Sequence, residues 1–420
     1  LFARLSYDYA DKYFIDGTIR RDGSSLFGAN NRYANFWSVG AMWSAKKENF
    51  FKDINWLNNL QLRVSYGTTG NSAIDNYLSY GLVGTGTIYN GNASWGLSSV
   101  DNKDLTWETV ESLNVGVNAR LFNFVDLNIE FYNKMTKDML MEIPFSYSTG
   151  FGSAWGNTGN MRNRGIDVEL GFDILNTKDF FFRAGVNFNY NKNEITKLFG
   201  GRDEFIVPNT GIKYQVGKSY GDFYYVKYAG VDPATGAPLY YDKEGKITTE
   251  YSENNAVFTG KNRYAPMSGG LNLDFSWNGI SLNVAFAGVF GKWLLNNDRY
   301  FSENPNFAAE SNQSARMMNM WTTPGQKTDI PGANYAVQFD THLLENASFI
   351  RLKNLQISYS LPKVWMQKTK VLNGVRVYAL ARNLWTITKY KGYDPENDSN
   401  LSLGKYPNSK QYTVGIELTF

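Results

Sequence analysis

The chain contains a single histidine, His342, and no cysteine. A serine hydrolase needs a histidine hydrogen-bonded to its nucleophile, and a zinc site needs several nitrogen or sulfur ligands. His342 stands in a long polar segment before a predicted strand, where a solvent-exposed histidine is much commoner than a catalytic one. The sequence therefore excludes thiol chemistry and a multi-histidine metal site. We expect no catalytic residue and no enzyme.

An oxygen-rich segment near the end of the chain is the best candidate for binding a cation. It contains Asp394, Glu396, Asn397 and Asp398, whose oxygen atoms are the ligand type that Ca²⁺ prefers. The spacing is not that of an EF-hand, and Pro395 indicates a turn. We expect these side chains to make turn and loop contacts, and we expect no bound metal.

Glycines at 84, 86 and 91 lie among polar residues. A nucleotide-binding loop needs a strand before the glycines and a helix after them, and neither pattern is present. The segment is typical of a flexible loop. The net charge is +3 with both signs interspersed, and no basic run indicates a nucleic acid. We expect no cofactor and no nucleic-acid partner.

Aromatic residues are dense in the long connecting segments. Their rings could stack on sugars or pack against a partner protein, and packing within the loops is equally compatible with the pattern. The candidates for substrate or partner contact are Tyr224, Tyr225, Tyr240, Tyr241, Tyr300, Phe301 and Trp321.

These side chains must be positioned by strands, because apolar and polar residues alternate strictly in many segments. The C-terminal segment is the clearest case, and a period of two means one apolar and one polar face. We predict that it is the assembly strand that ends a barrel. Its apolar row is Tyr412, Val414, Ile416, Leu418 and Phe420.

Charged residues keep to the polar row of the other strands. A Lys or Arg facing lipid at mid-membrane would cost roughly 2–4 kcal/mol. The polar rows are also rich in Asn, Ser, Gly and Thr, which suits a crowded, wet lumen. The predicted lumen-facing charges, which pair with one another or line a path, are Arg20, Arg63, Arg120, Asp167, Glu169 and Asp274.

Composition agrees with an all-β transmembrane antiparallel up-and-down β-barrel. No run of 18 apolar residues exists, and mean hydropathy is −0.40, as expected when half of each strand faces a polar lumen. Aromatic residues make up 16% of the chain. A soluble sandwich also hides one face of each sheet, so alternation alone does not exclude it.

The connections alternate between short and long. Short turns are predicted at 10–12, 122–123, 176–179 and 278–279, and long links at 23–33, 69–106, 139–162, 194–264, 294–346 and 387–409. Outer-membrane barrels have short periplasmic turns and long extracellular loops. We therefore predict that 194–264 and 294–346 are extracellular. The predicted strands are near 1–9, 13–22, 34–43, 59–68, 107–120, 124–138, 163–175, 180–193, 265–277, 280–293, 347–361, 372–386 and 410–420.

Thirteen strands is an odd number, whereas bacterial single-chain barrels have even numbers. The chain also begins with Leu1 in a predicted strand, not with Met. We therefore expect it to be the C-terminal part of one barrel domain, covering 1–420. An additional hairpin is predicted inside the longest loop, with strands at 220–228 and 238–241 joined by 232–236.

Several motifs together resemble one family. They lie at 16–28 (DGTIRRDGSSLFG), 31–33, 62–71, 159–167, 349–355, 359–362, 381–386 and 390–396 (YKGYDPE). In this order they resemble the SusC/RagA-type TonB-dependent transporters of Bacteroidetes. The resemblance runs from about residue 13 to 420, and it is specific as a set although each motif alone is weak.

The resemblance implies a 22-stranded barrel plugged by an N-terminal domain, of which this chain would be the last thirteen strands. It implies nutrient uptake across the outer membrane, with oligosaccharides or peptides as substrates and a SusD-like surface lipoprotein as a lid. The barrel would contact outer-membrane lipid. TonB would act through the plug and N-terminal segments that this chain lacks.

Two alternatives remain open on the sequence. A passive porin-like channel of about fourteen strands would conduct steadily in planar bilayers as this 420-residue chain. A soluble β-rich glycan-binding or adhesive protein would stay in solution without detergent, which the apolar row ending at Phe420 argues against.

Overall fold

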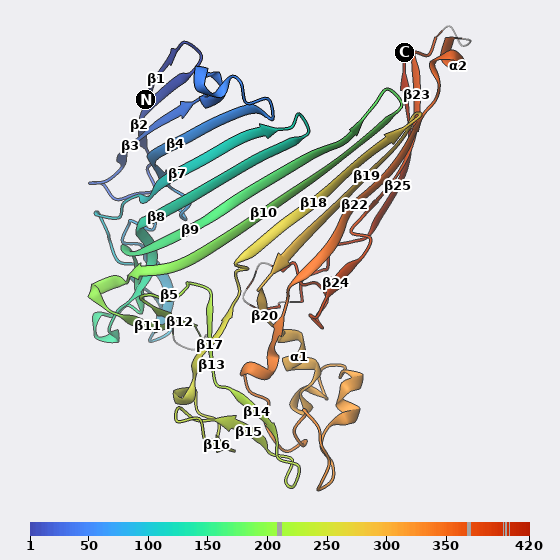
Figure 1. Ribbon diagram of the computed structural model, residues 1–420. Helices are drawn as coiled ribbons and strands as arrows, with labels where there is room; N and C mark the ends of the chain where they lie inside the picture. The colour runs from blue at the N-terminus through green and yellow to red at the C-terminus, as the bar shows by residue number, and fades with distance from the viewer. Residues whose placement is uncertain (208–211, 368–370, 398, 400, 403) are drawn as a thin grey trace. The chain divides into compact units, whose positions relative to one another are not determined.

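The computed structural model describes residues 1–207, 212–367, 371–397, 399, 401–402 and 404–420 (Figure 1). The chain divides into two compact units. The first comprises Leu1–Leu170, Asn191–Phe205 and Tyr214–Tyr220, and the second comprises Gly171–Tyr190, Ile206–Lys213 and Gly221–Phe420.

Long antiparallel strands dominate the fold. Among the described residues, the largest sheet has 14 strands, of which thirteen follow one another in the hydrogen-bonded order and β24 (Thr386–Thr388) pairs with β22. Each of the thirteen corresponds to one predicted strand, which confirms the all-β, antiparallel expectation. In order they are β1 (Phe2–Tyr9), β2 (Tyr13–Gly23), β3 (Tyr33–Trp43), β4 (Leu57–Asn71), β7 (Glu108–Leu121), β8 (Val125–Pro144), β9 (Ser153–Asn176), β10 (Phe180–Lys197), β18 (Met267–Trp277), β19 (Ile280–Phe290), β22 (Phe349–Ser360), β23 (Gly374–Arg382) and β25 (Gln411–Thr419).

The predicted short turns are present and have the backbone geometry of tight hairpins. Asn278 and Gly279 both have positive φ (46° and 86°), as do Phe122 and Asn123 (53° and 64°). Two successive positive φ values match the right-handed twist of the flanking strands. The hairpin β18–β19 therefore keeps its register over its whole length, from Trp277 opposite Ile280 onward.

The predicted long link at 139–162 is wrong. Strand β8 extends to Pro144 and strand β9 already begins at Ser153, so the link between them is short. A Cβ on Gly156 would lie 2.5 Å from Ile143, and one on Gly159 would lie 2.8 Å from the sulfur of Met141. The glycines thus make room for side chains of the neighbouring strand.

The first unit also contains a hairpin and short turns outside the large sheet. A small core beside the strands packs Phe27 against Trp107, with ring centroids 4.8 Å apart, and buries Phe36 and Leu105. The additional elements are β5 (Val83–Tyr89), β6 (Asn92–Leu97), η1 (Ala45–Lys47), η2 (Asn49–Phe51), η3 (Tyr147–Thr149) and η4 (Phe199–Gly201).

The second unit contains several small sheets in its long connections. Their buried clusters include Phe223, Tyr225, Leu295, Leu343 and Leu344. The elements are β13 (Asp222–Tyr225), β14 (Tyr228–Val231), β15 (Pro238–Tyr241), β16 (Ile247–Thr248), η5 (Glu253–Asn255), β17 (Val257–Asn262), β20 (Trp293–Leu295), α1 (Asn297–Ser302), η6 (Pro305–Phe307), η7 (Ala315–Asn319), η8 (Thr341–Leu343), β21 (Leu344–Asn346) and α2 (Lys363–Gln367), while β11 (Glu204–Val207) and β12 (Ile212–Gln215) precede β13 in a four-stranded sheet.

The additional hairpin predicted in the longest connection exists, with one boundary corrected. Its second strand, β15, has the predicted bounds, but its first strand is β14 and not the segment 220–228. Residues 222–225 form β13, which pairs with β12 and β17. The strands at 222–225 and 228–231 therefore belong to different sheets, which the sequence prediction did not separate.

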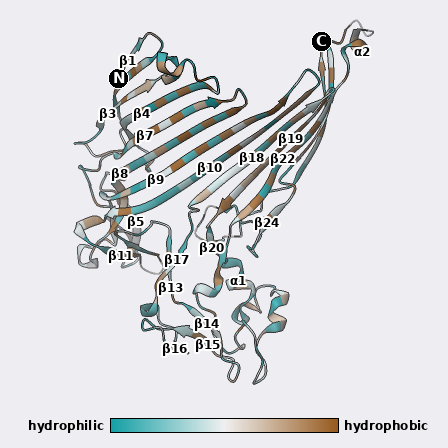
Figure 2. Ribbon diagram, in the orientation of Figure 1, coloured by the Kyte–Doolittle hydropathy of each residue, from teal (hydrophilic) through white to brown (hydrophobic). Residues whose placement is uncertain are grey.

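Brown apolar and teal polar residues alternate along many strands of the large sheet (Figure 2). None of the helices within the described parts of the chain is long and apolar enough to cross a membrane.

Candidate substrate-path residues and family

Arg63 on β4 reaches across its neighbouring strand to β8. Its guanidinium donates to Asn128 Oδ1 at 3.0 Å and lies 3.3 Å from Glu130 Oε2. The strand between them, β7, carries Gly116 at the crossing, where a Cβ would lie 2.9 Å from the guanidinium. Asn128 in turn donates to Glu169 Oε2 at 3.3 Å. Glycine at 116 therefore permits a polar ladder across four strands.

The other predicted lumen-facing charges also have close partners. Arg120 pairs with Asp126 at 2.9 Å across the β7–β8 hairpin. Arg20 pairs with Asp22 at 2.7 Å, and Asp274 accepts from Asn283 at 2.6 Å. Asp167 also has a partner. Pairs this exposed contribute roughly 0–1 kcal/mol each, so they make the row polar without making it rigid. That the row faces a lumen stays a prediction.

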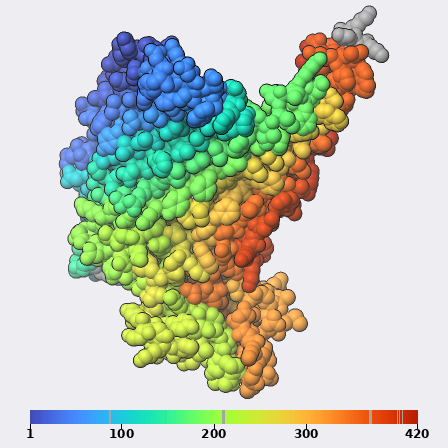
Figure 3. Space-filling view, in the orientation of Figure 1, coloured from blue at the N-terminus to red at the C-terminus, as the bar shows by residue number. Residues whose placement is uncertain are grey.

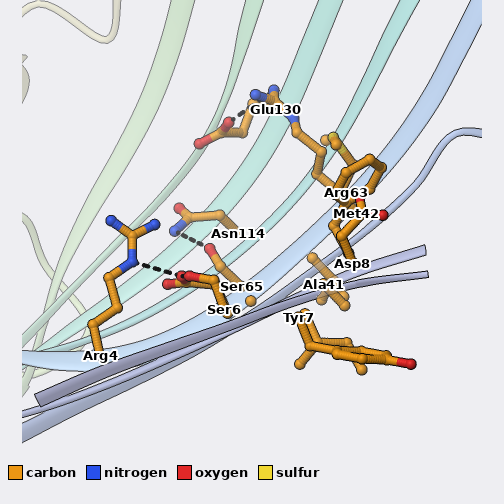
Figure 4. A pocket seen from close by; sticks show the side chains of 16 residues that line it. Arg4, Ser6, Tyr7, Asp8, Ala41, Met42, Arg63, Ser65, Asn114 and Glu130 are labelled. Carbon is orange, nitrogen blue, oxygen red and sulfur yellow. Dashed lines mark hydrogen bonds and ion pairs between the residues drawn. The ribbon is translucent and has the colours of Figure 1, made fainter. Parts of the chain in front are cut away.

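A hollow of about 440 Å³ lies over this row in the first unit (Figure 4). Arg4 donates to Asp16 Oδ2 at 2.7 Å on one side, and Asn114 donates to Ser65 Oγ at 3.3 Å on the other. Its charged, hydroxyl and amide groups stand among apolar side chains, which include Tyr7, Phe14, Ile15, Ala41, Met42 and Val64. The mixture suits weak, varied contacts better than one tightly held ligand.

Part of the aromatic set predicted to contact substrate or partners is buried. Tyr240 is 2% exposed, with its ring centroid 6.0 Å from that of Tyr228 and 5.3 Å from that of Tyr251. Tyr225 is 7% exposed and packs beside Phe223. Burial raises the pKa of Tyr225 to about 12, so its hydroxyl stays neutral. Packing within the loops accounts for these two tyrosines.

The rest of the set lies nearer the surface. Tyr300 stacks on Phe339 with centroids 4.1 Å apart, and Trp321 donates its indole N–H to the Pro233 carbonyl at 3.0 Å. Tyr241 and Phe301 are about 40% exposed, at 36% and 41%. Tyr224 packs edge-on against Phe258. A contact role for the exposed rings stays a prediction.

His342 is not the solvent-exposed loop residue that we predicted. Its Nδ1 lies 2.6 Å from Oδ1 of the buried Asp340, and its ring lies 5.1 Å from that of Tyr228. Its side chain is 17% exposed. The correction has a tertiary cause, since Tyr228 stands 114 positions earlier in the chain. The imidazole ties η8 to β14 and supports a structural role.

A buried arginine cluster beside α1 was not predicted. Arg299 donates to Glu303 and Glu345, and both carboxylates are under 10% exposed. Burial alone would lower the pKa of Arg299, but the two carboxylates outweigh it and raise that pKa above its ordinary value. The cluster ties α1 to β21 by charge pairing. Its members carried no periodic signal in the sequence.

A second ionic cluster joins β22 to the oxygen-rich segment, and we call Arg351, Lys353, Asp394 and Glu396 the β22 latch. Arg351 is 5% exposed and bonds Asp394 Oδ1 and Glu396 Oε2, each at 2.6 Å. Lys353 bonds both oxygens of Glu396, at 2.5 and 2.7 Å. The latch holds the segment against the polar row of β22.

Other groups complete the latch. The backbone N–H of Asn408 donates to Asp394 Oδ2 at 2.8 Å, and Lys292 donates to the carbonyls of Pro395 and Asn397. Burial alone would raise the pKa of Asp394, but Arg351 and the backbone N–H groups outweigh it and lower that pKa.

The loop-contact role expected for the oxygen-rich segment agrees with this geometry. The oxygens of Asp394 and Glu396 are engaged by cations, so they are not open to Ca²⁺. Asp398 lies outside the described residues. Among the parts of the chain that the structure describes, no group of three or more His, Asp or Glu is arranged to hold a metal ion.

Among the described strands, β25 ends the hydrogen-bonded order of the large sheet and pairs with β23. In the second unit its residues form part of the red surface strip in Figure 3. The predicted apolar row is exposed, from 48% at Leu418 to 78% at Val414. An edge strand with a bare apolar row needs a partner and an apolar solvent. Its role in assembly stays a prediction.

Comparison with known proteins identifies the family of the chain. Residues 1–384 match the family described as "TonB dependent receptor-like, beta-barrel". The chain belongs to this family. It is thus the barrel part of a protein from a family of outer-membrane transporters, not of enzymes, and the soluble alternative is excluded.

Named relatives assign it to the SusC/RagA type. The chain is 43% identical to a chain of "Structure of the RagAB peptide transporter", with a TM-score of 0.92. The match covers 100% of this chain and 47% of that one. The chain is 32% identical to TonB-dependent receptor P3 of Formosa agariphila, covering 45% of it, and 30% identical to TonB-dependent receptor SusC of Bacteroides thetaiotaomicron, covering 43%. The chain spans about half the length of these relatives.

Proposed function

We propose that the protein imports oligosaccharides or peptides across the outer membrane, driven through TonB. The observation that supports it best is the 43% identity over the whole chain to a peptide transporter of the same fold. Family membership of residues 1–384 supports the energy source.

In this proposal the strands of the large sheet form the wall of the passage. The row that includes Arg63, Glu130 and Glu169 faces the water-filled interior, and the row of β25 that includes Val414 faces lipid. The long connections 194–264 and 294–346 lie outside the cell. There they form a platform for a SusD-like lipoprotein lid, a partner that the RagAB complex suggests.

Energised import is tested with the full-length protein in its native cell. Uptake of a labelled peptide mixture and of labelled maltohexaose is measured with and without TonB, and again after a proton uncoupler is added. We expect uptake to fall at least tenfold in both cases. Uptake that is unchanged without TonB would reject the proposal.

A passive porin-like channel is the second candidate, and the same protein tests it. Such a channel would conduct steadily in planar bilayers without an energy source. A full-length transporter is expected to stay closed under those conditions. The lid is tested separately, by asking whether a surface lipoprotein co-purifies with the tagged barrel in detergent.

A further inference from the structure

A cavity of about 160 Å³ lies between α1 and the segment that the β22 latch holds in place. It is smaller than the roughly 300–1,000 Å³ of sites for drug-sized ligands, so it suits one side chain or one chain terminus. All its described lining residues belong to the second unit. None of them has a role in the proposed wall of the passage.

One carboxylate of the cavity has no ionic partner among the described residues. Its lining includes three carboxylates, of Asp298, Asp394 and Glu396. The latch cations neutralise the last two. Asp298 has a backbone hydrogen bond to Ser402 at 3.2 Å, but no hydrogen bond or ion pair to its carboxylate is present among the described residues. Lys405 also borders the cavity and is already engaged in an interaction.

The hydroxyl of Tyr390 is a second group in the cavity whose hydrogen bonding to the described residues is incomplete. Tyr390 is 6% exposed, and its hydroxyl makes no well-aligned hydrogen bond to the described residues, although it lies toward the hydroxyl of Ser402. Leaving a buried polar group unsatisfied is unfavourable, and a ligand that hydrogen-bonds to it would remove that cost. Burial raises the pKa of Tyr390 to about 12, so the group is a neutral hydroxyl whose oxygen can accept.

The free groups are mainly acceptors, and exposed rings stand beside them. The amide oxygen of Asn408 also has no partner among the described residues, since only its nitrogens donate, to Asp394 and Glu396. Tyr393 is 75% exposed and Tyr406 is 92% exposed. An ammonium group has three donors, no acceptor and an affinity for aromatic faces. A neutral sugar ring would bring acceptors as well, and would leave the Asp298 charge unpaired.

We propose that this cavity is a subsite for a protonated amine, either the N-terminus or a lysine side chain of an imported peptide. Asp298 pairs with the ammonium, Tyr390 accepts from it, and the rings of Tyr393 and Tyr406 cover its outer side. The proposal rests on the proposed import function and narrows its substrate class to peptides.

Peptide binding to the full-length transporter in detergent tests the subsite by isothermal titration. The probes are the hexapeptide Ala-Ala-Ala-Phe-Ala-Ala amide, its N-acetylated form, and N-acetylated Ala-Lys-Ala-Phe-Ala-Ala amide. We expect at least one amine-bearing peptide to bind about tenfold more tightly than the acetylated, lysine-free peptide, which corresponds to about 1.4 kcal/mol. The two amine-bearing probes separate a terminal amine from a lysine side chain.

Substitutions test whether the tighter binding of amine-bearing peptides depends on this cavity. Asp298→Asn is expected to abolish the tenfold preference, whereas Glu244→Gln, at an exposed acid in a different loop, keeps it. Tyr406→Ala weakens amine-dependent binding and Tyr406→Phe retains it, because the ring is kept. Tyr406 is so exposed that neither change threatens folding.

Three results would overturn the subsite: equal binding of acetylated and free peptides, an Asp298→Asn protein that keeps the preference, or displacement of the peptide by maltohexaose in an Asp298-dependent manner. Uptake without TonB would instead reject energised import and leave an amine-dependent Asp298 effect standing. The two failures are therefore distinguishable.

Discussion

Arg351 on β22 and Asp394, 43 positions later, meet at 2.6 Å with Arg351 only 5% exposed. The planar guanidinium bonds two carboxylates at once, which an ammonium group does not reproduce. Together with Lys353, Lys292 and Asn408, this contact holds the segment that follows β24 against β22. It also forms one side of the proposed amine subsite.

Replacing Arg351 with Met should release that segment. Removing one partner of a buried pair leaves uncompensated charge and costs about 3–5 kcal/mol. We expect lower thermal stability and new protease cleavage near Asp394 in the full-length protein. Arg351→Lys should show an intermediate effect. Arg376→Met is the control, because its partner Glu417 is 3.5 Å away and 60% exposed; an equal effect there would contradict a special role for the latch.

The latch should weaken in acid. The pKa of Asp394 is lower in the folded protein than its ordinary value of 3.8. The contribution of Asp394 to the free energy of unfolding is therefore complete above pH 3.8, and it is lost as the pH falls through the lowered pKa. Pepsin cleavage near Asp394, measured from pH 5 to pH 2, should rise only below pH 3.8. In Asp394→Asn this step should disappear, and its persistence would assign the transition to another carboxyl.

The two rows of β25 should respond oppositely to a charge. Val414→Arg places a cation on the proposed lipid row, at a cost of roughly 2–4 kcal/mol near the membrane centre. Thr413→Arg places it on the other row and should be tolerated. Heat-modifiable migration of the full-length protein on gels measures assembly. If Thr413→Arg were the more damaging change, the assignment of the faces would be reversed.

Tyr240 should matter more for loop stability than its neighbour Tyr241. Tyr240→Ala removes a ring that is 2% exposed, and such truncations cost about 3–5 kcal/mol. Hydrogen exchange of the amides in β14, β15 and β16 should accelerate. Tyr241→Ala, at a ring 36% exposed, should leave exchange nearly unchanged. Similar exchange in both variants would show that the tyrosine cluster does not stabilise this sheet.

The strands were predictable because their cause is local. A strand between two unlike environments needs apolar and polar residues in alternation. This alternation is visible in the sequence at consecutive positions such as 412–420. The tight turns were predictable for the same reason, as at Asn278 and Gly279. The ends of β8 and β9 were not predicted, and Gly156 and Gly159 leave room there for side chains of β8, a contact that exists only in the folded sheet.

The site depended on contacts between distant residues. The aromatic residues in the loops were visible in the sequence, but which of them are buried was not, since Tyr240 is covered by Tyr228 and Tyr251 only after folding. Arg351 and Asp394 stand in two separate motifs that the sequence analysis recognised, but their pairing was not predicted. Periodicity therefore determined the sheet. The tertiary structure alone decided the latch and left the Asp298 carboxylate without a partner among the described residues, because charge pairing and desolvation depend on distances in space that no local pattern encodes.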